Sequence, residues 1–179
     1  MTYLIALLVS AALVIADQLS KNYIVAHFAV GQSQPVIDGV FHITYVQNRG
    51  AAFGIFQNQP WIFLSITTIV MLVCVSLLIK KTFHSRMMHW ALFLVLAGGV
   101  GNMIDRLFRV DENGGRFVVD FLEARFIDFP VFNIADICVV IGAALIVLYF
   151  VIDTVQDLRK TRRKKVPALG EEQPCEKKS

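Results

Sequence analysis

Long runs of apolar residues, separated by short polar stretches, dominate the pattern of this chain. An α-helix needs roughly 20 predominantly apolar residues to cross a bilayer, and four segments approach or exceed that length. They are residues 3–24, 61–79, 88–104 and 134–152. The second has no charged residue, whereas the first carries Asp17 and Lys21 in its last two turns. The pattern therefore predicts an integral membrane protein that is mainly α-helical.

The first apolar segment could also be read as a cleaved signal peptide. Its N-terminal sequence "MTY" contains no Lys or Arg, and no small-x-small cleavage site stands out before Asp17. We therefore expect this segment to be retained as the first of four transmembrane helices.

The connection 26–60 contains signals for β-structure. Asp38-Gly39 separates two apolar runs, which is typical of a hairpin turn, and residues 40–46 are rich in β-branched and aromatic residues. We expect a short hairpin here.

The connection 107–133 has the same character, with a turn at 113–115 and a strand at 116–121. Two hairpins on one side of the membrane could pair into a small sheet. The expected fold is a four-transmembrane-helix bundle, residues 1–155, with a small β-sheet formed by the outward-facing loops.

Composition and charge support this topology. The chain is 56% hydrophobic and 17% charged, whereas soluble domains carry about a quarter charged residues. Basic residues gather at Lys80, Lys81 and Arg86 and in "RKTRRKK", residues 159–165, while the connection 26–60 has only Arg49. By the positive-inside rule, both termini are cytoplasmic and the two long connections face outward.

The basic tail, residues 156–179, is expected to be disordered and to contact membrane lipids rather than nucleic acid. Cys74 and Cys138 fall within spans and Cys175 in the tail, so neither a disulfide framework nor a metal site is indicated.

Ionisable residues within spans are costly and call for a reason. Asp17 and Lys21 are spaced i,i+4 and can pair. Such an ion pair could simply stabilise the outer end of the first span. Alternatively, Lys21 could be a positioning charge beside an outer site.

In "AGGVGNMIDR", Gly98, Asn102 and Asp105/Arg106 share one helix face. The glycines allow close approach of another helix, and Asn102 can hydrogen-bond across the contact. Arg106 ends its span on the outer side, where it could hold a substrate carbonyl or an acidic partner.

Asn48, Asp120 and Asp136 have two interpretations each. Asn48 and Gly50, in "QNRGAAFG", suit a turn, and Asn48 could equally donate a hydrogen bond to substrate. Asn133 and Asp136 have the spacing of a capping box at the start of the fourth span. Asp120 could be a solvated acid at a strand end, or half of a catalytic pair with Asp136.

Other chemistries are poorly supported. The four histidines are scattered, and no Ser/His/Asp or HExxH arrangement is present. A non-enzymatic transporter or assembly factor could use Asp17, Asp136 and Arg106 as a polar path. The transporter hypothesis predicts ionisable residues spread through the bilayer depth, whereas in this sequence they gather at the outer ends of the spans.

Five motifs occur in an order that resembles the lipoprotein signal peptidase (signal peptidase II) family. They are "DQLSK" (17–21), "NRGAAFG" (48–54), "GGVGNMIDR" (98–106), "VVDF" (118–121) and "FNIAD" (132–136). The resemblance implies an aspartyl protease of the bacterial cytoplasmic membrane with its site at the outer face. Such enzymes remove signal peptides from prolipoproteins before a cysteine that carries diacylglycerol.

The resemblance also assigns residues. Asp120 and Asp136 match the two catalytic aspartates, and Asp17 and Lys21 match the first motif. The positions that match residues lining the site are Asn48, Gly50, Asn102, Arg106 and Asn133. The family uses no metal or other cofactor and is inhibited by the cyclic peptide globomycin, so the implied partners are diacylglyceryl-prolipoproteins, membrane lipids and this inhibitor.

Overall fold

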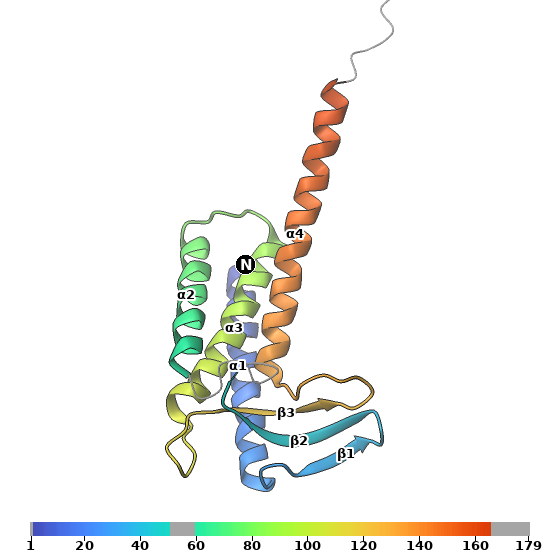
Figure 1. The fold of residues 1–179 in the computed structure, drawn as a ribbon. Coiled ribbons are helices and arrows are strands. Elements are labelled where there is room, and N and C mark those ends of the chain that lie inside the picture. Colours follow the sequence, from blue (N-terminus) through green and yellow to red (C-terminus); the bar gives the residue numbers. More distant parts are fainter. Residues whose placement is uncertain (1, 51–59, 166–179) are drawn as a thin grey trace, which may run out of the picture.

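The computed structural model describes residues 2–50 and 60–165 and forms a helical bundle with a small sheet at one end (Figure 1). The helices are α1 (Thr2–His27), α2 (Pro60–Ile79), α3 (Arg86–Phe108) and α4 (Ile134–Lys165). Helix α3 is central and packs against α1, α2 and α4. The first residues of α1 and the α2–α3 connection lie at the end opposite the sheet (Figure 1).

All four helices are long and apolar enough to cross a membrane, which confirms the four predicted spans. Large apolar side chains such as Leu4, Ile69, Leu72 and Val140 are exposed on the bundle surface. In water this surface would be unfavourable, whereas in a bilayer lipid covers it. The sheet therefore lies at one membrane surface.

The ends of the helices differ from the predicted spans. α1 continues to His27, α3 covers Arg86–Phe108, and α4 continues to Lys165. The expected start of a disordered tail at residue 156 therefore differs from the structure. Residues 156–165 contain no Gly or Pro, and Asp157 and Lys160 can pair one turn apart, at 3.8 Å, so the helix continues. Residues 166–179, including Cys175, lie outside the described residues.

The sheet has three antiparallel strands in the order β1 (Ser33–Ile37), β2 (Phe41–Asn48), β3 (Val118–Ala124). The predicted hairpin turn at Asp38-Gly39 joins β1 to β2, and Gly39 has a φ of +68°, a conformation that glycine adopts without strain. Strand β3 pairs with β2 so that Asp120 lies opposite Val46. The small sheet formed by the two long connections is thus confirmed.

The second predicted hairpin is only partly present. Val110 and Arg116 form a single isolated bridge, and the turn between them is closed by the Asp111 side chain, which accepts from the backbone of Gly115. The strand predicted at 116–121 begins at Val118 instead, because its partner is β2 rather than the chain preceding the turn.

An apolar core between α1 and the sheet fixes the orientation of β3. It comprises Ile24 of α1 together with Tyr45, Phe117, Val119 and Phe121. Because successive strand residues point to opposite faces, burying Val119 and Phe121 against α1 turns Asp120 toward the other face. The packing of this core therefore aims the Asp120 side chain.

Glycines bring α3 close to its neighbours, as predicted. A Cβ on Gly98 would collide with the carbonyl oxygen of Ala135, and one on Gly101 would lie 2.7 Å from the Asp17 carboxylate. These contacts place the first turn of α4 directly against α3. That first turn carries Asp136.

Candidate active site

The two predicted aspartates come from different elements and are linked through one asparagine. Asp120 lies on β3 with 2% of its surface exposed, and Asp136 lies in the first turn of α4. The Asn133 side-chain amide donates to Asp120 Oδ1 at 2.6 Å, and its backbone N–H donates to Asp136 Oδ2 at 3.1 Å. Asn133 therefore contacts both carboxylates, from its side chain and its backbone.

The capping box predicted for α4 is present. The Asp136 backbone N–H donates to Asn133 Oδ1 at 2.9 Å, which makes the pairing of these two residues reciprocal. A further N–H of this first turn, from Ala135, donates to Asp17 Oδ1 at 2.9 Å. Side chains thus accept hydrogen bonds from the N–H groups of Asn133, Ala135 and Asp136, and they hold Asp136 in a defined position.

Asn102 connects Asp136 to a buried lysine. Its amide nitrogen donates to Asp136 Oδ1 at 2.7 Å, and its Oδ1 accepts from Lys21 Nζ at 2.9 Å. Asn133 Nδ2 also donates to Asn102 Oδ1, at 3.1 Å. Because the ammonium can only donate, it orients the Asn102 amide with the nitrogen toward Asp136.

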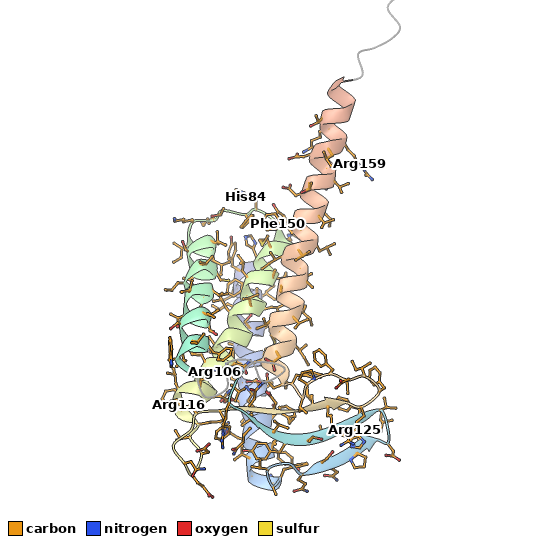
Figure 2. All side chains as sticks on the ribbon, in the orientation of Figure 1. His84, Arg106, Arg116, Arg125, Phe150 and Arg159 are labelled. Carbon is orange, nitrogen blue, oxygen red and sulfur yellow. The ribbon has the colours of Figure 1, made fainter. Side chains whose placement is uncertain are left out.

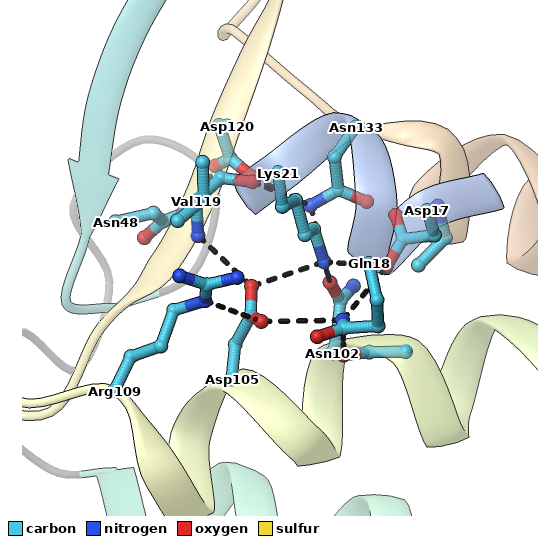
Figure 3. Close-up of polar contacts among 12 residues, drawn as sticks. Asp17, Gln18, Lys21, Asn48, Asn102, Asp105, Arg109, Val119, Asp120 and Asn133 are labelled. Atoms are coloured by element: carbon cyan, nitrogen blue, oxygen red, sulfur yellow. Dashed lines mark hydrogen bonds and ion pairs between the residues drawn. The ribbon is translucent and has the colours of Figure 1, made fainter. Parts of the chain in front are cut away.

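Lys21 is fully buried at the centre of a charged cluster (Figure 3). Its Nζ lies 2.9 Å from Asp17 Oδ2 and 3.1 Å from Asp105 Oδ2. The Arg109 guanidinium lies 2.9 Å from Asp105 Oδ1. The predicted Asp17–Lys21 pair is therefore present. The same lysine also contacts Asn102, the asparagine beside Asp136. Lys21 can thus both form the stabilising ion pair and act as a positioning charge.

Asp105 makes more contacts in the structure than the sequence indicated. In addition to its two ion pairs, its Oδ2 accepts from the backbone N–H of Val119 at 3.1 Å, which ties α3 to the strand residue preceding Asp120. Gln18 bridges the same cluster through Asp17, Asp105 and the Gly101 carbonyl. The i,i+4 spacing of Asp105 and Arg109 was an available sign that Asp105 is paired.

Asn48 fulfils the turn interpretation and also contacts a predicted catalytic residue. Its Oδ1 accepts from the backbone N–H of Gly50 at 3.0 Å, while its amide nitrogen donates to Asp120 Oδ2 at 2.8 Å. Asp120 therefore receives one hydrogen bond on each carboxylate oxygen, from Asn48 and Asn133. The rest of that motif, residues 51–54, lies outside the described residues.

A largely apolar cavity of about 480 Å³ opens beside the two aspartates. Its polar lining includes both carboxylates, Asn48 and Arg106. The Arg106 guanidinium lies 5.1 Å from the centre of the Phe63 ring, at the same end of the bundle as the sheet (Figure 2). The apolar walls come from α2, from the segment before α4 and from α4: Phe63, Phe129, Pro130, Val131, Phe132, Ile137, Val140 and Ile141.

The environment of Asp120 favours its protonated form. Burial and, to a smaller extent, the nearby Asp136 carboxylate raise the pKa of Asp120, to about 7. The hydrogen bonds from Asn48 and Asn133 and the charge of Lys21 act in the opposite direction. Near neutral pH the pair can therefore hold one proton, the condition in which one carboxyl acts as an acid and the other as a base.

Within residues 2–50 and 60–165, no group of three or more His, Cys, Asp or Glu side chains is placed to hold a metal ion. Cys74 and Cys138 are buried free thiols inside the bundle. Among the described residues, the polar side chains that line the cavity are the two carboxyls, the Asn48 amide and Arg106.

Comparisons with known proteins identify the family of this chain. Residues 9–152 match the family model described as signal peptidase (SPase) II. A lipoprotein signal peptidase of Shouchella clausii is 41% identical over 162 residues, 90% of this chain and 100% of that protein. One of Halalkalibacterium halodurans is 36% identical over 160 residues, 88% of this chain and 96% of that protein.

Two solved structures, both titled as bacterial membrane enzymes, share the fold. Each is 36% identical to this chain, with TM-scores of 0.76 and 0.71. The first alignment covers 83% of this chain and 88% of the other, and the second covers 81% and 91%. The family model alone spans most of the chain, including both aspartates. The chain belongs to the signal peptidase II family of membrane peptidases.

Proposed function

We propose that this protein is an aspartyl endopeptidase that removes signal peptides from diacylglyceryl-modified prolipoproteins, cutting before the lipidated cysteine. The observation that carries the proposal is that Asn133 donates hydrogen bonds to both Asp120 and Asp136, beside an apolar cavity. Family membership supports the substrate class. The pairing of two carboxyls at the start of a membrane helix supports the aspartyl mechanism.

The chemistry follows from one proton shared by two acids. The ionised carboxylate takes a proton from a water molecule, whose oxygen attacks the carbonyl carbon of the scissile peptide bond. The protonated carboxyl polarises that carbonyl and then supplies a proton to the nitrogen of the leaving cysteine. The titration belongs to the pair, so either aspartate can serve in either role.

The neighbouring side chains have positioning roles in this proposal. Asn48, Asn102 and Asn133 donate hydrogen bonds to the carboxylates and fix their orientation. Arg106, in the same cavity wall, is suited to binding a carbonyl oxygen of the substrate. Asp17 accepts a hydrogen bond from the backbone of α4, and Lys21 donates one to Asn102. These two contacts help to fix the positions of α4 and Asn102.

We place the enzyme in the bacterial cytoplasmic membrane, with both termini in the cytoplasm and the aspartates at the outer, periplasmic face. The distribution of Lys and Arg supports this orientation. Hydrolysis needs water, which the hydrocarbon core lacks. A pair of aspartates at the end of the spans, beside the sheet, can receive water from outside and a lipid-anchored substrate from the bilayer.

A transporter or assembly factor that uses a polar path is less favoured. The buried aspartate and lysine side chains of the described spans, Asp17, Lys21 and Asp105, contact one another beside β3. They are not spread through the depth of the bundle. This clustering supports a site at one membrane surface.

The test is mass spectrometry of a purified, diacylated prolipoprotein incubated with the protein in detergent. We expect two products whose masses place the cut directly before the lipidated cysteine. Globomycin should block the reaction and EDTA should not. Loss of activity in EDTA that added metal restores, or a cut at another bond, would contradict the proposal.

A further inference from the structure

A second, smaller cavity begins at Asp136 and Arg106 and runs into the membrane part of the bundle. It has a volume of about 300 Å³ and shares Asp136, Arg106 and Val140 with the first cavity. Its remaining walls come from α2, α3 and α4, and we call it the α2 slot. The two cavities thus meet at Asp136 and Arg106.

The length of the α2 slot follows from the residues on α3. Its lining extends from Arg106 at the mouth to Val95 at the deep end. With a rise of 1.5 Å per residue, these positions are about 16 Å apart along the helix. Half of the hydrocarbon core of a bilayer is about 15 Å thick, so the slot reaches roughly to the membrane midplane.

The width of the slot limits what can enter. An α-helix about 10–12 Å across would occupy roughly 1,300–1,800 Å³ over about 16 Å of length. This is several times the volume of the slot, about 300 Å³. A single hydrocarbon chain at van der Waals separation of about 4 Å from its neighbours fits.

Gly99 lines the slot on α3, at a point where α2 packs closely against that helix. A Cβ at this position would lie 3.2 Å from Met71 Cγ and 3.5 Å from Thr67 Cγ2, both on α2. The distance to Met71 is shorter than most Cβ contacts and the distance to Thr67 is an ordinary van der Waals contact, so a larger side chain at Gly99 would crowd Met71 and project into the slot. Gly99 is about 10 Å below Arg106 along α3.

The polarity of the slot matches an ester-linked acyl chain. The mouth carries the Arg106 guanidinium, which can donate to an ester carbonyl oxygen, and the deeper part is lined by groups such as Val95, Met71 and Val139. A leucine side chain of the signal peptide would reach only the mouth. We propose that the α2 slot binds one acyl chain of the substrate's diacylglyceryl group, while the peptide occupies the larger cavity.

This inference rests on the proposed function, and acyl-chain length tests it. Purified wild type and a Gly99→Leu variant are given the same prolipoprotein peptide with either dipalmitoyl or dioctanoyl glycerol on its cysteine. An eight-carbon chain ends near Gly99, whereas a sixteen-carbon chain must pass it. We expect Gly99→Leu to lower kcat/KM for the dipalmitoyl substrate by about tenfold or more, since each buried methylene contributes to binding.

Cleavage of the dioctanoyl substrate should stay close to that of the wild type, which also shows that the variant is folded. Thr67→Phe should have the same chain-length effect from the α2 side. Ile69→Phe is the matched control, because Ile69 lies on α2 with 61% of its surface exposed and does not line the slot. Equal effects of Gly99→Leu and Thr67→Phe on both substrates, or no effect on either, would overturn the inference.

Photo-crosslinking separates this inference from the proposed function, because it requires binding and not cleavage. A dipalmitoyl substrate with a diazirine at the end of one acyl chain should label wild-type residues near Met71 and Val95. Labelling confined to the outer surfaces of α1 or α4 would overturn the slot assignment. Labelling within the slot without any cleavage would uphold the slot and contradict the peptidase proposal.

Discussion

The hydrogen bond from Asn48 to Asp120 allows the acid–base proposal to be tested through pH. Asn48→Ala removes the amide nitrogen that lies 2.8 Å from Asp120 Oδ2. This N–H stabilises the ionised carboxylate, and its loss therefore raises the pKa of Asp120, which burial already places at about 7. The reaction requires one proton on the pair, so the loss of that proton defines the alkaline limb of the pH profile.

The size of the shift follows from the strength of the bond. A hydrogen bond to a charged group contributes about 1.5–3 kcal/mol. Since 1.36 kcal/mol corresponds to one pKa unit, its removal should raise the pKa of Asp120 by about 1–2 units. The alkaline limb of cleavage should therefore move from near pH 7 to about pH 8–9, even if the maximal rate falls.

The assay is the rate of prolipoprotein cleavage in detergent between about pH 5 and pH 10, a range that brackets both limbs. Gln47→Ala is the matched control, because Gln47 is the neighbouring residue but donates to Tyr45 Oη instead of Asp120. The control should keep the wild-type alkaline limb. An Asn48→Ala profile with an unchanged limb, or one displaced to lower pH, would refute the reasoning that this hydrogen bond affects the proton held by the Asp120–Asp136 pair.

Two stability predictions follow from the buried contacts around the aspartates. Lys21→Met leaves the Asp17 and Asp105 carboxylates without their buried cation and should destabilise the protein by about 3–5 kcal/mol, measured by thermal unfolding in detergent. Lys160→Met, at an exposed pair on α4, should cost less than about 1 kcal/mol, and an equal loss in both variants would contradict the account. Gly98→Ala forces α3 away from the first turn of α4 and should cost about 1–3 kcal/mol and slow cleavage. Full activity of Gly98→Ala at wild-type stability would show that this close contact does not position Asp136.

Local features of the sequence predicted much of the fold. The length of the apolar segments was sufficient to predict the four spans, and the pair Asp38-Gly39 was sufficient to predict the first hairpin turn. The Asn133–Asp136 capping box and the Asp17–Lys21 pair were also predictable, because each depends on residues one helical turn apart. The resemblance to a family then brought Asp120 and Asp136 together, which spacing alone left open.

Long-range contacts could not be read from the sequence. Nothing local indicates that Asp105 holds the backbone of Val119, or that Asp17 caps α4 through Ala135. The pairing of β3 with β2, rather than within its own hairpin, depends on the core that Val119 forms with α1. The continuation of α4 to Lys165 was missed because polarity was taken as the end of the helix, although the residues there favour helix.

The central claim is that Asp120 and Asp136 are both required to activate water. The direct measurement is the rate at which Asp120→Asn and Asp136→Asn, each purified from the membrane, cleave a diacylated prolipoprotein, followed by mass spectrometry. Each variant should insert into the membrane normally and lose activity by a factor on the order of a thousand or more, since an amide cannot exchange the proton that the reaction moves. Robust cleavage by either variant would contradict the account.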